Sequence, residues 1–238
     1  MAHNGVACGV PGAQQCCGAL HVHSGMMEDA RVLARKNIDA FATNDDPIVV
    51  TAAGCGAALK EYGHLLKDDP AYAGRAEAFS HRVKDVTEFL AAGAFIFPTK
   101  PVDATVTYQE PCHLAHAQRI TAQPRALLNS IPGLTLKEMK ESSLCCGSAG
   151  VYNIIRREMA DDLGDRKAEH IVNTEADVVV TANPGCHMQL RTSLRRNNST
   201  MPVRHIVELL DESYGGAEAE RTGKWAIDQR GFVDQELR

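Results

Sequence analysis

The stretch “CCGSAGVYN”, residues 145–153, places two adjacent cysteines in front of a glycine-rich turn. A similar stretch, “CCGALHVHSG” at residues 16–25, lies 129 positions earlier in the chain. A second pair has nearly the same offset, because “IVVTAAGCG” at residues 48–56 is matched by “VVVTANPGC” at residues 178–186. Two similar pairs at nearly one offset are typical of an internal repeat. The chain is therefore predicted to be a tandem duplication.

The second unit of the predicted pair, residues 101–214, carries the complete pattern. Apolar, β-branched stretches such as “ATVTYQEPC” (104–112) indicate strands, and amphipathic stretches between them indicate helices. This alternation predicts an α/β fold with a Rossmann-like parallel sheet and helices on its faces. Ligand sites in such sheets lie beyond the carboxyl ends of the strands. Four cysteines that follow predicted strands are expected to meet there: Cys112, Cys145, Cys146 and Cys186.

The first unit, residues 1–100, is expected to follow the same plan without its beginning. Cys112 precedes Cys145 by 33 residues, and the matching position before Cys16 would fall before Met1. This unit is therefore predicted to be truncated at its N-terminus, lacking one strand, one helix and one cysteine. Its remaining candidate ligands are Cys16, Cys17 and Cys55.

Two parts of the chain lie outside this plan. Cys8 would align with a position inside a strand of the second unit, and we expect it to be a small buried hydrophobic residue. Residues 215–238 have weak periodicity and are expected to form a loosely docked C-terminal tail.

The composition limits the classes of function. The chain has 238 residues, 44% of them hydrophobic, and a net charge of -5 without a run of basic residues, so nucleic acid is not an expected partner. The longest apolar run, “FLAAGAFIF” at residues 89–97, is too short to span a membrane. The first residues have neither the basic nor the apolar region of a signal peptide. A cytoplasmic location is expected, where eight cysteines indicate metal or redox chemistry more than disulfides.

Thiolates bind soft metals and iron–sulfur clusters. Two adjacent cysteines, with one from each of two other strand ends, suit an iron–sulfur cluster held by a discontinuous site. Backbone N–H groups of the following turn are expected to approach its sulfurs. The residues of that turn are Gly147, Ser148 and Gly150.

Zinc is the alternative metal. The absence of any C-x-x-C pair weakens this interpretation, because structural zinc sites favour such pairs. Histidines close to the cysteines could still complete a zinc site. We expect three of them to surround the ligands instead of binding the metal: His21, His23 and His113. Three further polar residues are expected to cap, pair with or line the site: Asn153, Arg166 and Lys167.

The cysteine stretches, together with “EPCHLAHAQ” (110–118), “LGDRK” (163–167) and “VRHIVELL” (203–210), resemble the cysteine-rich CCG family. Within that family the resemblance is greatest to the C-terminal part of the iron–sulfur subunit of glycolate oxidase (glycolate dehydrogenase). It covers about residues 5–214.

This resemblance implies an electron-transfer subunit with a [4Fe-4S] cluster and no catalytic residues of its own. Its implied partner is an FAD-containing 2-hydroxy-acid dehydrogenase subunit, and its electrons would pass toward a quinone-type acceptor. Such a subunit would not turn over alone. The family's subunit also carries a ferredoxin-like domain, which implies either that a separate domain or chain supplies it here or that this sequence is a fragment. Peripheral association with the inner face of the membrane through the complex is also implied.

The resemblance leaves two further functions open. Relatives of the heterodisulfide reductase type act on thiols and disulfides, and they bind a non-cubane cluster through C-x-x-C pairs. Of those pairs, this chain keeps only Cys55 and Cys186, so the cluster type stays open. A zinc-stabilised structural module is the other alternative.

Overall fold

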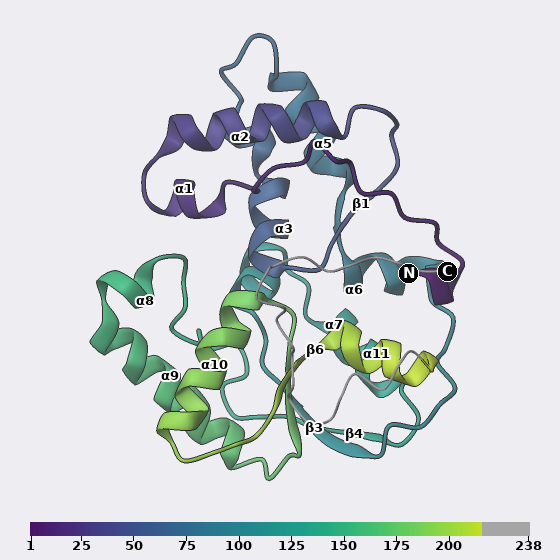
Figure 1. The fold of residues 1–238 in the computed structure, drawn as a ribbon, viewed down its shortest axis with the longest axis vertical. Helices are drawn as coiled ribbons and strands as arrows, with labels where there is room; N and C mark the ends of the chain where they lie inside the picture. The colour runs from purple at the N-terminus through teal and green to yellow at the C-terminus, as the bar shows by residue number, and fades with distance from the viewer. Residues whose placement is uncertain (216–238) are drawn as a thin grey trace, which may run out of the picture.

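The computed structural model describes residues 1–215, so the expected C-terminal tail lies outside the described residues apart from Gly215. Two separate parallel sheets organise this part of the chain, one in each predicted unit (Figure 1). The expected parallel α/β class is therefore confirmed.

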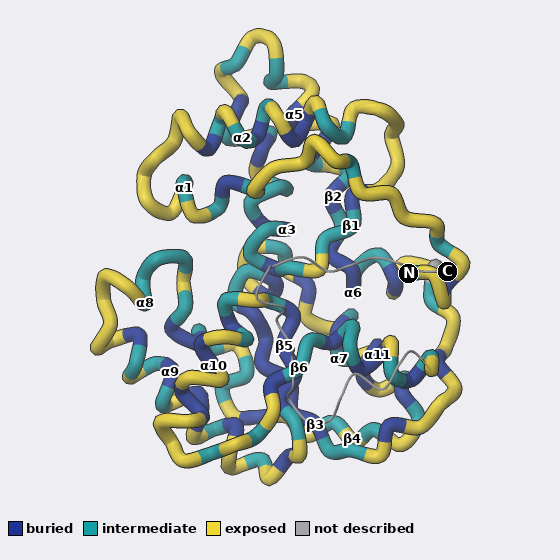
Figure 2. Tube along the Cα trace, in the orientation of Figure 1, coloured by how far each residue is buried: buried dark blue, intermediate teal, exposed yellow. Residues whose placement is uncertain are grey.

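The larger sheet belongs to residues 101–214 and has the strand order β4-β3-β5-β6. All three neighbouring pairs are parallel, with Val106 opposite both Leu136 and Val178. The strands are β3 (Ala104–Tyr108), β4 (Leu134–Lys137), β5 (Val178–Thr181) and β6 (Val203–His205). The central strands β3 and β5 are the most deeply buried (Figure 2).

Helices cover both faces of this sheet. Successive side chains of a strand point to opposite faces, and β5 shows this directly. Val179 packs into the core under α9 (Arg157–Val172) and α10 (Pro184–Arg196). Val180 packs into the core under α7 (Ala122–Asn129) and α11 (Ile206–Tyr214). Two short helical segments complete the unit: the π-helical turn His113–Ala117 and α8 (Tyr152–Ile155).

The smaller sheet belongs to residues 1–100 and consists of two parallel strands, β1 (Ile48–Val50) and β2 (Val83–Asp85). Its core is formed around the stacked rings of Tyr62 and Phe79, whose centroids are 5.3 Å apart. Its α-helices are α1 (Ala19–His23), α2 (Met27–Ala40), α3 (Ala53–Lys60), α4 (Tyr62–Leu65), α5 (Ala73–Arg82) and α6 (Val86–Phe89). Short 3-10 and π-helical segments span Ala2–Asn4 and Leu90–Ala94.

The junctions that follow β2 and β6 are built alike. Asp85 caps α6 in a capping box with Glu88, and His205 caps α11 in a capping box with Glu208. In each box the side chain of the first residue accepts a backbone N–H of the helix, and the glutamate accepts one in return. This likeness agrees with the duplication, which stays a prediction.

The exposure of Cys8 differs from what the sequence predicts. It was predicted to be buried, but it is exposed, in a segment without regular structure between Gly5 and Gly18. A strand would have buried its thiol, and no strand forms there. Among residues 1–215, no helix is both long enough and apolar enough to cross a membrane.

The two sheets predict unequal local stability. Strands β1 and β2 have three residues each and one partner each, whereas β3 and β5 have partners on both sides. Backbone amides of β1 and β2 should therefore exchange with solvent at least roughly tenfold faster than those of β3 and β5, because fewer contacts must break to open them. Hydrogen exchange followed by mass spectrometry measures this difference, and equal protection of both sheets would contradict it.

Candidate functional site

The cysteine loops of the larger sheet gather at one edge because its strands run in the same direction. Cys112 follows β3, Cys145 and Cys146 follow β4, and Cys186 lies in the first turn of α10 after β5. These four residues are called the second-unit thiol group. Cys146 and Cys186 are buried, and the other two are partly exposed.

Neighbouring thiols of this group shift one another's pKa values. Hydrogen bonds from Cys112 and Cys146 lower the pKa of Cys145. A hydrogen bond from Cys146 likewise lowers the pKa of Cys186. The same hydrogen bonds raise the pKa of the two donor thiols. The loops therefore bring the four thiols close enough to shift one another's pKa values, and Cys145 and Cys186 are the two whose pKa is lowered.

Positive and polar groups surround these sulfurs. The Gly147 N–H donates to Cys145 Sγ at 3.4 Å, and Asn183 Nδ2 donates to Cys186 Sγ at 3.5 Å. The side chain of Lys167 is fully buried, and desolvation lowers its pKa to about 8, while Cys146 and Cys145 act in the opposite direction. These groups favour negative charge on the thiol group.

Lys167 also holds the loop that carries Cys145. Its Nζ donates to the carbonyl oxygens of Glu141 and Ser142, at 2.5 and 3.0 Å. The Glu141 carboxylate is paired with Arg166 and with His170, and the hydrogen bond from Arg166 lowers its pKa. Both Lys167 and Arg166 therefore anchor the cysteine loop from α9.

Two glycines of this loop cannot be replaced without strain. Gly147 has φ +91, and a Cβ at this position would lie 2.3 Å from the carbonyl oxygen of Ala160. Gly150 has φ +64, and a Cβ there would lie 2.9 Å from the His23 ring. Ser148 packs on Gly185, next to Cys186. Asn153 lies in α8 and donates to Gln189 of α10, at 3.3 Å.

Three cysteines of residues 1–100 form a second cluster, the first-unit thiol group: Cys16, Cys17 and Cys55. The Cys17 thiol donates to Cys55 Sγ at 3.2 Å, and this hydrogen bond lowers the pKa of Cys55 to about 7. Cys16 is exposed and hydrogen-bonds with Cys17.

A buried polar pair fixes the backbone of this cluster. The Tyr62 hydroxyl donates to the carbonyl oxygen of Cys17 at 3.0 Å. Asn37 Nδ2 donates to the carbonyl oxygen of Cys16 and to the Tyr62 hydroxyl, both at 3.0 Å. Neither Tyr62 nor Asn37 was expected from the sequence to support the site.

The two thiol groups are joined by a seam between the units. Asn183 Oδ1 accepts the Gly54 N–H at 2.9 Å, while Nδ2 of the same side chain donates to Cys186. The Ala53 N–H donates to the carbonyl oxygen of Ala182 at 3.1 Å. Asn183 therefore links the loop of Cys55 to the loop of Cys186.

Two histidines, one from each side of this seam, also contact each other. The rings of His23 and His113 meet edge to face, with centroids 5.6 Å apart, and His113 Nδ1 lies 3.6 Å from Cys112 Sγ. Burial, the largest cause, lowers the pKa of His113, with a smaller contribution from His23. His21 is different, because its Nδ1 is buried and has no hydrogen-bond partner within residues 1–215. No hydrogen bond joins the His21 ring to either thiol group in that part of the chain.

The sequence did not point to Asn183. Its signal was a break in the repeat, because “TANPGC” has one residue more before its cysteine than “TAAGC”. Within the described residues, no three His, Cys, Asp or Glu side chains converge closely enough to hold a single metal ion. The four neighbouring thiols, the N–H donors and the buried lysine fit a larger anionic group of several metal ions, which an iron–sulfur cluster is.

Comparison with known proteins gives one family and several relatives. A family model described as the cysteine-rich domain CCG matches residues 1–60 and 106–191. The “Probable glycolate oxidase iron-sulfur subunit” of Bacillus subtilis is 43% identical over 211 residues, which are 87% of this chain and 48% of that protein.

Two further relatives differ in length. A component of the fumarate reductase (CoM/CoB) of Methanothermobacter marburgensis is 37% identical over 90% of this chain and 42% of its own length. The “Lactate utilization protein A 2” of Bacillus cereus is 32% identical over 87% of this chain and 86% of its own length. The chain therefore spans less than half of the first two relatives and most of the third.

Replacement of Asn183 tests the seam. Asn183→Leu leaves the Gly54 N–H without its acceptor, and we expect the free energy of unfolding to fall by about 1–3 kcal/mol. Asn173→Leu is the control, because Asn173 is exposed at the end of α9 and should change little. Urea denaturation of the metal-free chain measures both. Equal stability of the two variants would show that the seam contributes nothing.

Proposed function

The chain belongs to the CCG family of cysteine-rich domains, and we propose that it is an iron–sulfur electron-transfer subunit of a flavin-dependent 2-hydroxy-acid oxidase or dehydrogenase of the glycolate type. The observation that carries this proposal is the second-unit thiol group: four thiols from three strand ends that shift one another's pKa values, with two N–H donors and a buried lysine beside them.

The proposed cluster ligands in residues 101–214 are Cys112, Cys145, Cys146 and Cys186. When bound, a [4Fe-4S] cluster would accept and release single electrons. The residues around it have separate tasks. The Gly147 N–H and the Asn183 amide direct hydrogen bonds to thiolate sulfurs, and Lys167 offsets negative charge from beneath the loop.

The other parts of the proposal concern the assembly. Electrons would come from an FAD-containing dehydrogenase subunit, with a ferredoxin-like domain or chain between, and would leave toward a quinone-type acceptor on the cytoplasmic side. Residues 1–100 and 101–214 are proposed as two CCG units. The first-unit thiol group, Cys16, Cys17 and Cys55, is the proposed second redox position. Substrate oxidation would belong to the flavin partner.

A thiol/disulfide redox subunit is the second candidate. Two observations favour it: the Cys17 and Cys55 sulfurs lie 3.2 Å apart, and one relative is named for CoM/CoB. Such a protein would show spectral changes of its redox centre when thiols or disulfides are added. Unchanged spectra would dismiss this candidate.

Removal of one thiol tests the cluster. We expect the anaerobically purified chain to contain iron and acid-labile sulfide, and Cys145→Ser to lose most of both, because Cys145 accepts hydrogen bonds from two neighbouring ligands. Cys8→Ser is the matched control, since Cys8 is exposed and apart from both thiol groups. Zinc without sulfide in the parent would overturn the proposal.

The buried lysine predicts a shift in reduction potential. Lys167→Met should lower the reduction potential by an amount on the order of 100 mV, since two unit charges about 8 Å apart interact by about 2 kcal/mol at an effective dielectric constant of about 20. Lys140→Met removes the same charge from an exposed position in the preceding loop. Redox titration followed by electron paramagnetic resonance measures both. Equal potentials of these two variants would refute a tuning role for Lys167.

A further inference from the structure

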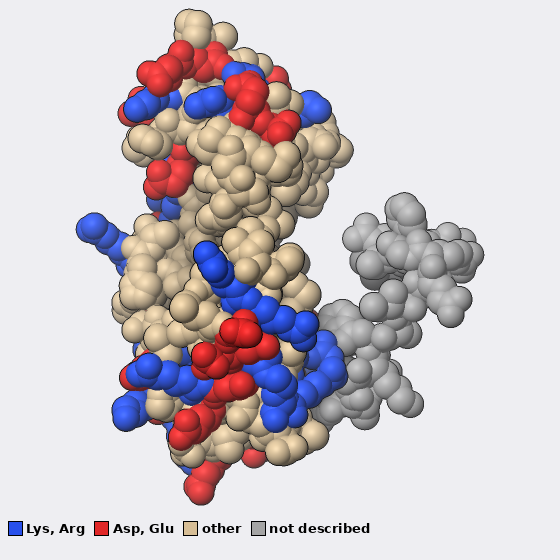
Figure 3. All heavy atoms as spheres, turned by 90° about the vertical axis from the view of Figure 1, so that its left-hand side faces the viewer, with Lys and Arg blue, Asp and Glu red and all other residues tan. Residues whose placement is uncertain are grey.

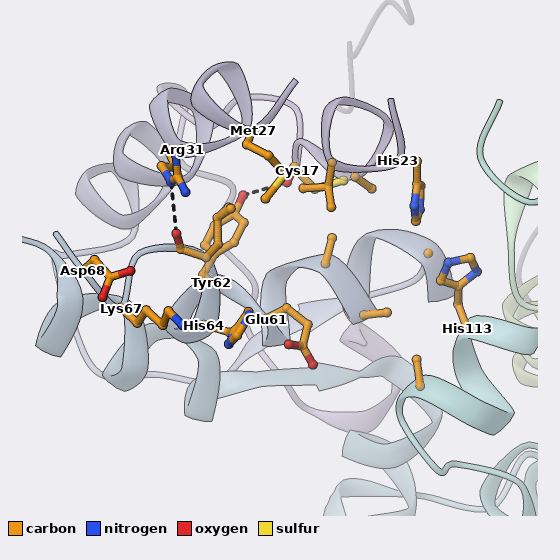
Figure 4. A pocket seen from close by; sticks show the side chains of 17 residues that line it. Cys17, His23, Met27, Arg31, Glu61, Tyr62, His64, Lys67, Asp68 and His113 are labelled. Carbon is orange, nitrogen blue, oxygen red and sulfur yellow. Dashed lines mark hydrogen bonds between the residues drawn. The ribbon is translucent and has the colours of Figure 1, made fainter. Parts of the chain in front are cut away.

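A cavity of about 360 Å³ opens beside the first-unit thiol group (Figure 4). Its walls come from α1 and α2 on one side and from α3 and α4 on the other. The lining combines apolar side chains with charged ones: Ala19, Val22, Met27, Ala57, Ala58 and Leu65 are apolar, and Arg31, Glu61, Lys67 and Asp68 are charged. The apolar part of this lining favours a small, largely apolar molecule.

The cavity reaches both candidate redox positions. Cys17 lies on its wall, and the Cys17 thiol contacts Cys55 Sγ at 3.2 Å. His113 also lines the cavity, and its Nδ1 lies 3.6 Å from Cys112 Sγ in the second-unit thiol group. Figure 4 shows His23 and His113 together at one end, with Arg31, Lys67 and Asp68 toward the other. A molecule in the cavity would therefore lie beside both thiol groups.

The polar groups of the cavity further restrict its ligand. The Tyr62 hydroxyl donates to the carbonyl oxygen of Cys17, and Arg31 Nε donates to the carbonyl oxygen of Leu65. Within residues 1–215, the imidazoles of His23 and His64 have no hydrogen-bond partner in the protein and are available as donors. Apolar walls with two imidazoles match a ring that carries carbonyl oxygens.

The molecular surface agrees with this preference. Figure 3 shows the face that carries α1 and α8, where charged side chains gather mainly over the two ends of the molecule. The waist between these ends, where the two units meet, has fewer charges. The sparse charge there suits an uncharged molecule, while the charged side chains of the cavity itself include Arg31, which pairs with Glu28.

We propose that this cavity binds the ring of a quinone-type electron acceptor. The inference rests on the proposed function, because that function supplies the electrons. In each of two steps a reduced iron–sulfur centre would give up one electron and be oxidised, and the flavoprotein partner would re-reduce it between the steps. The quinone would take up the two electrons with two protons from solvent and become the quinol. The hydrogen bonds from His23 and His64 would go to the two carbonyl oxygens.

Binding can be measured without any turnover. Duroquinone is a suitable probe, because methyl groups occupy all its free ring positions and the cysteine thiols therefore do not add to the ring. Equilibrium dialysis under anaerobic conditions should show saturable binding to the full chain. Ala58→Phe fills the cavity from α3 and should weaken binding at least tenfold. Ala78→Phe is the control, because Ala78 is exposed on α5 and outside the cavity.

A second cavity variant keeps the test valid if Ala58→Phe does not fold. Met27→Glu introduces a carboxylate at the exposed first residue of α2, a position that tolerates acidic side chains. It should also weaken duroquinone binding at least tenfold, while circular dichroism stays that of the parent. Binding that is absent in the parent, or equal in the parent and both cavity variants, would overturn the proposal. So would preferential binding of hydroxyethyl disulfide that Ala58→Phe abolishes.

The failure of this inference is separable from that of the proposed function. If the parent chain contains iron and sulfide but does not bind duroquinone, only the proposal of an acceptor site is wrong. If it binds duroquinone in this cavity but contains no iron or sulfide, the binding site is supported and the electron-transfer function is wrong.

Discussion

Parallel strands end at the same edge of a sheet, and this constraint places all the chemistry of the molecule. In the larger sheet it gathers the loops after β3, β4 and β5, so cysteines from positions 112 to 186 reach one another. In the smaller sheet the loop after β1 delivers Cys55 to Cys17. The loops after β1 and β5 meet at the Gly54 N–H and the Asn183 side chain, which joins the two clusters.

The local pattern of the sequence was sufficient to predict the fold class and the grouping of the thiols. Runs such as 178–181 are apolar and β-branched, and they form buried central strands. Cysteines in the segments that follow such strands lie near the carboxyl edge of the sheet, so the spacing predicted that the second-unit thiols would lie close together. The same reasoning failed for Cys8, because no strand forms around it and its thiol stays exposed.

The residues that support the two thiol groups could not be predicted from the local sequence in this way. Tyr62 reaches Cys17 across 45 positions, and Asn183 reaches Gly54 across 129. Nothing in the local sequence of Tyr62 or Asn183 marks these partners, because tertiary packing alone creates them. Lys167 is intermediate: its place in “LGDRK” suggested a site residue, whereas its complete burial under the cysteine loop is a property of the fold.

The distance along the chain between the seam residues also bears on how the protein folds. Contacts of long sequence separation form slowly, since the chain must lose loop entropy before they add any stability. The seam joins residues 129 positions apart, whereas each sheet is closed by contacts within its own unit. The two halves would thus acquire their separate cores first, and the paired thiol loops would be the last part of the molecule to take their final arrangement.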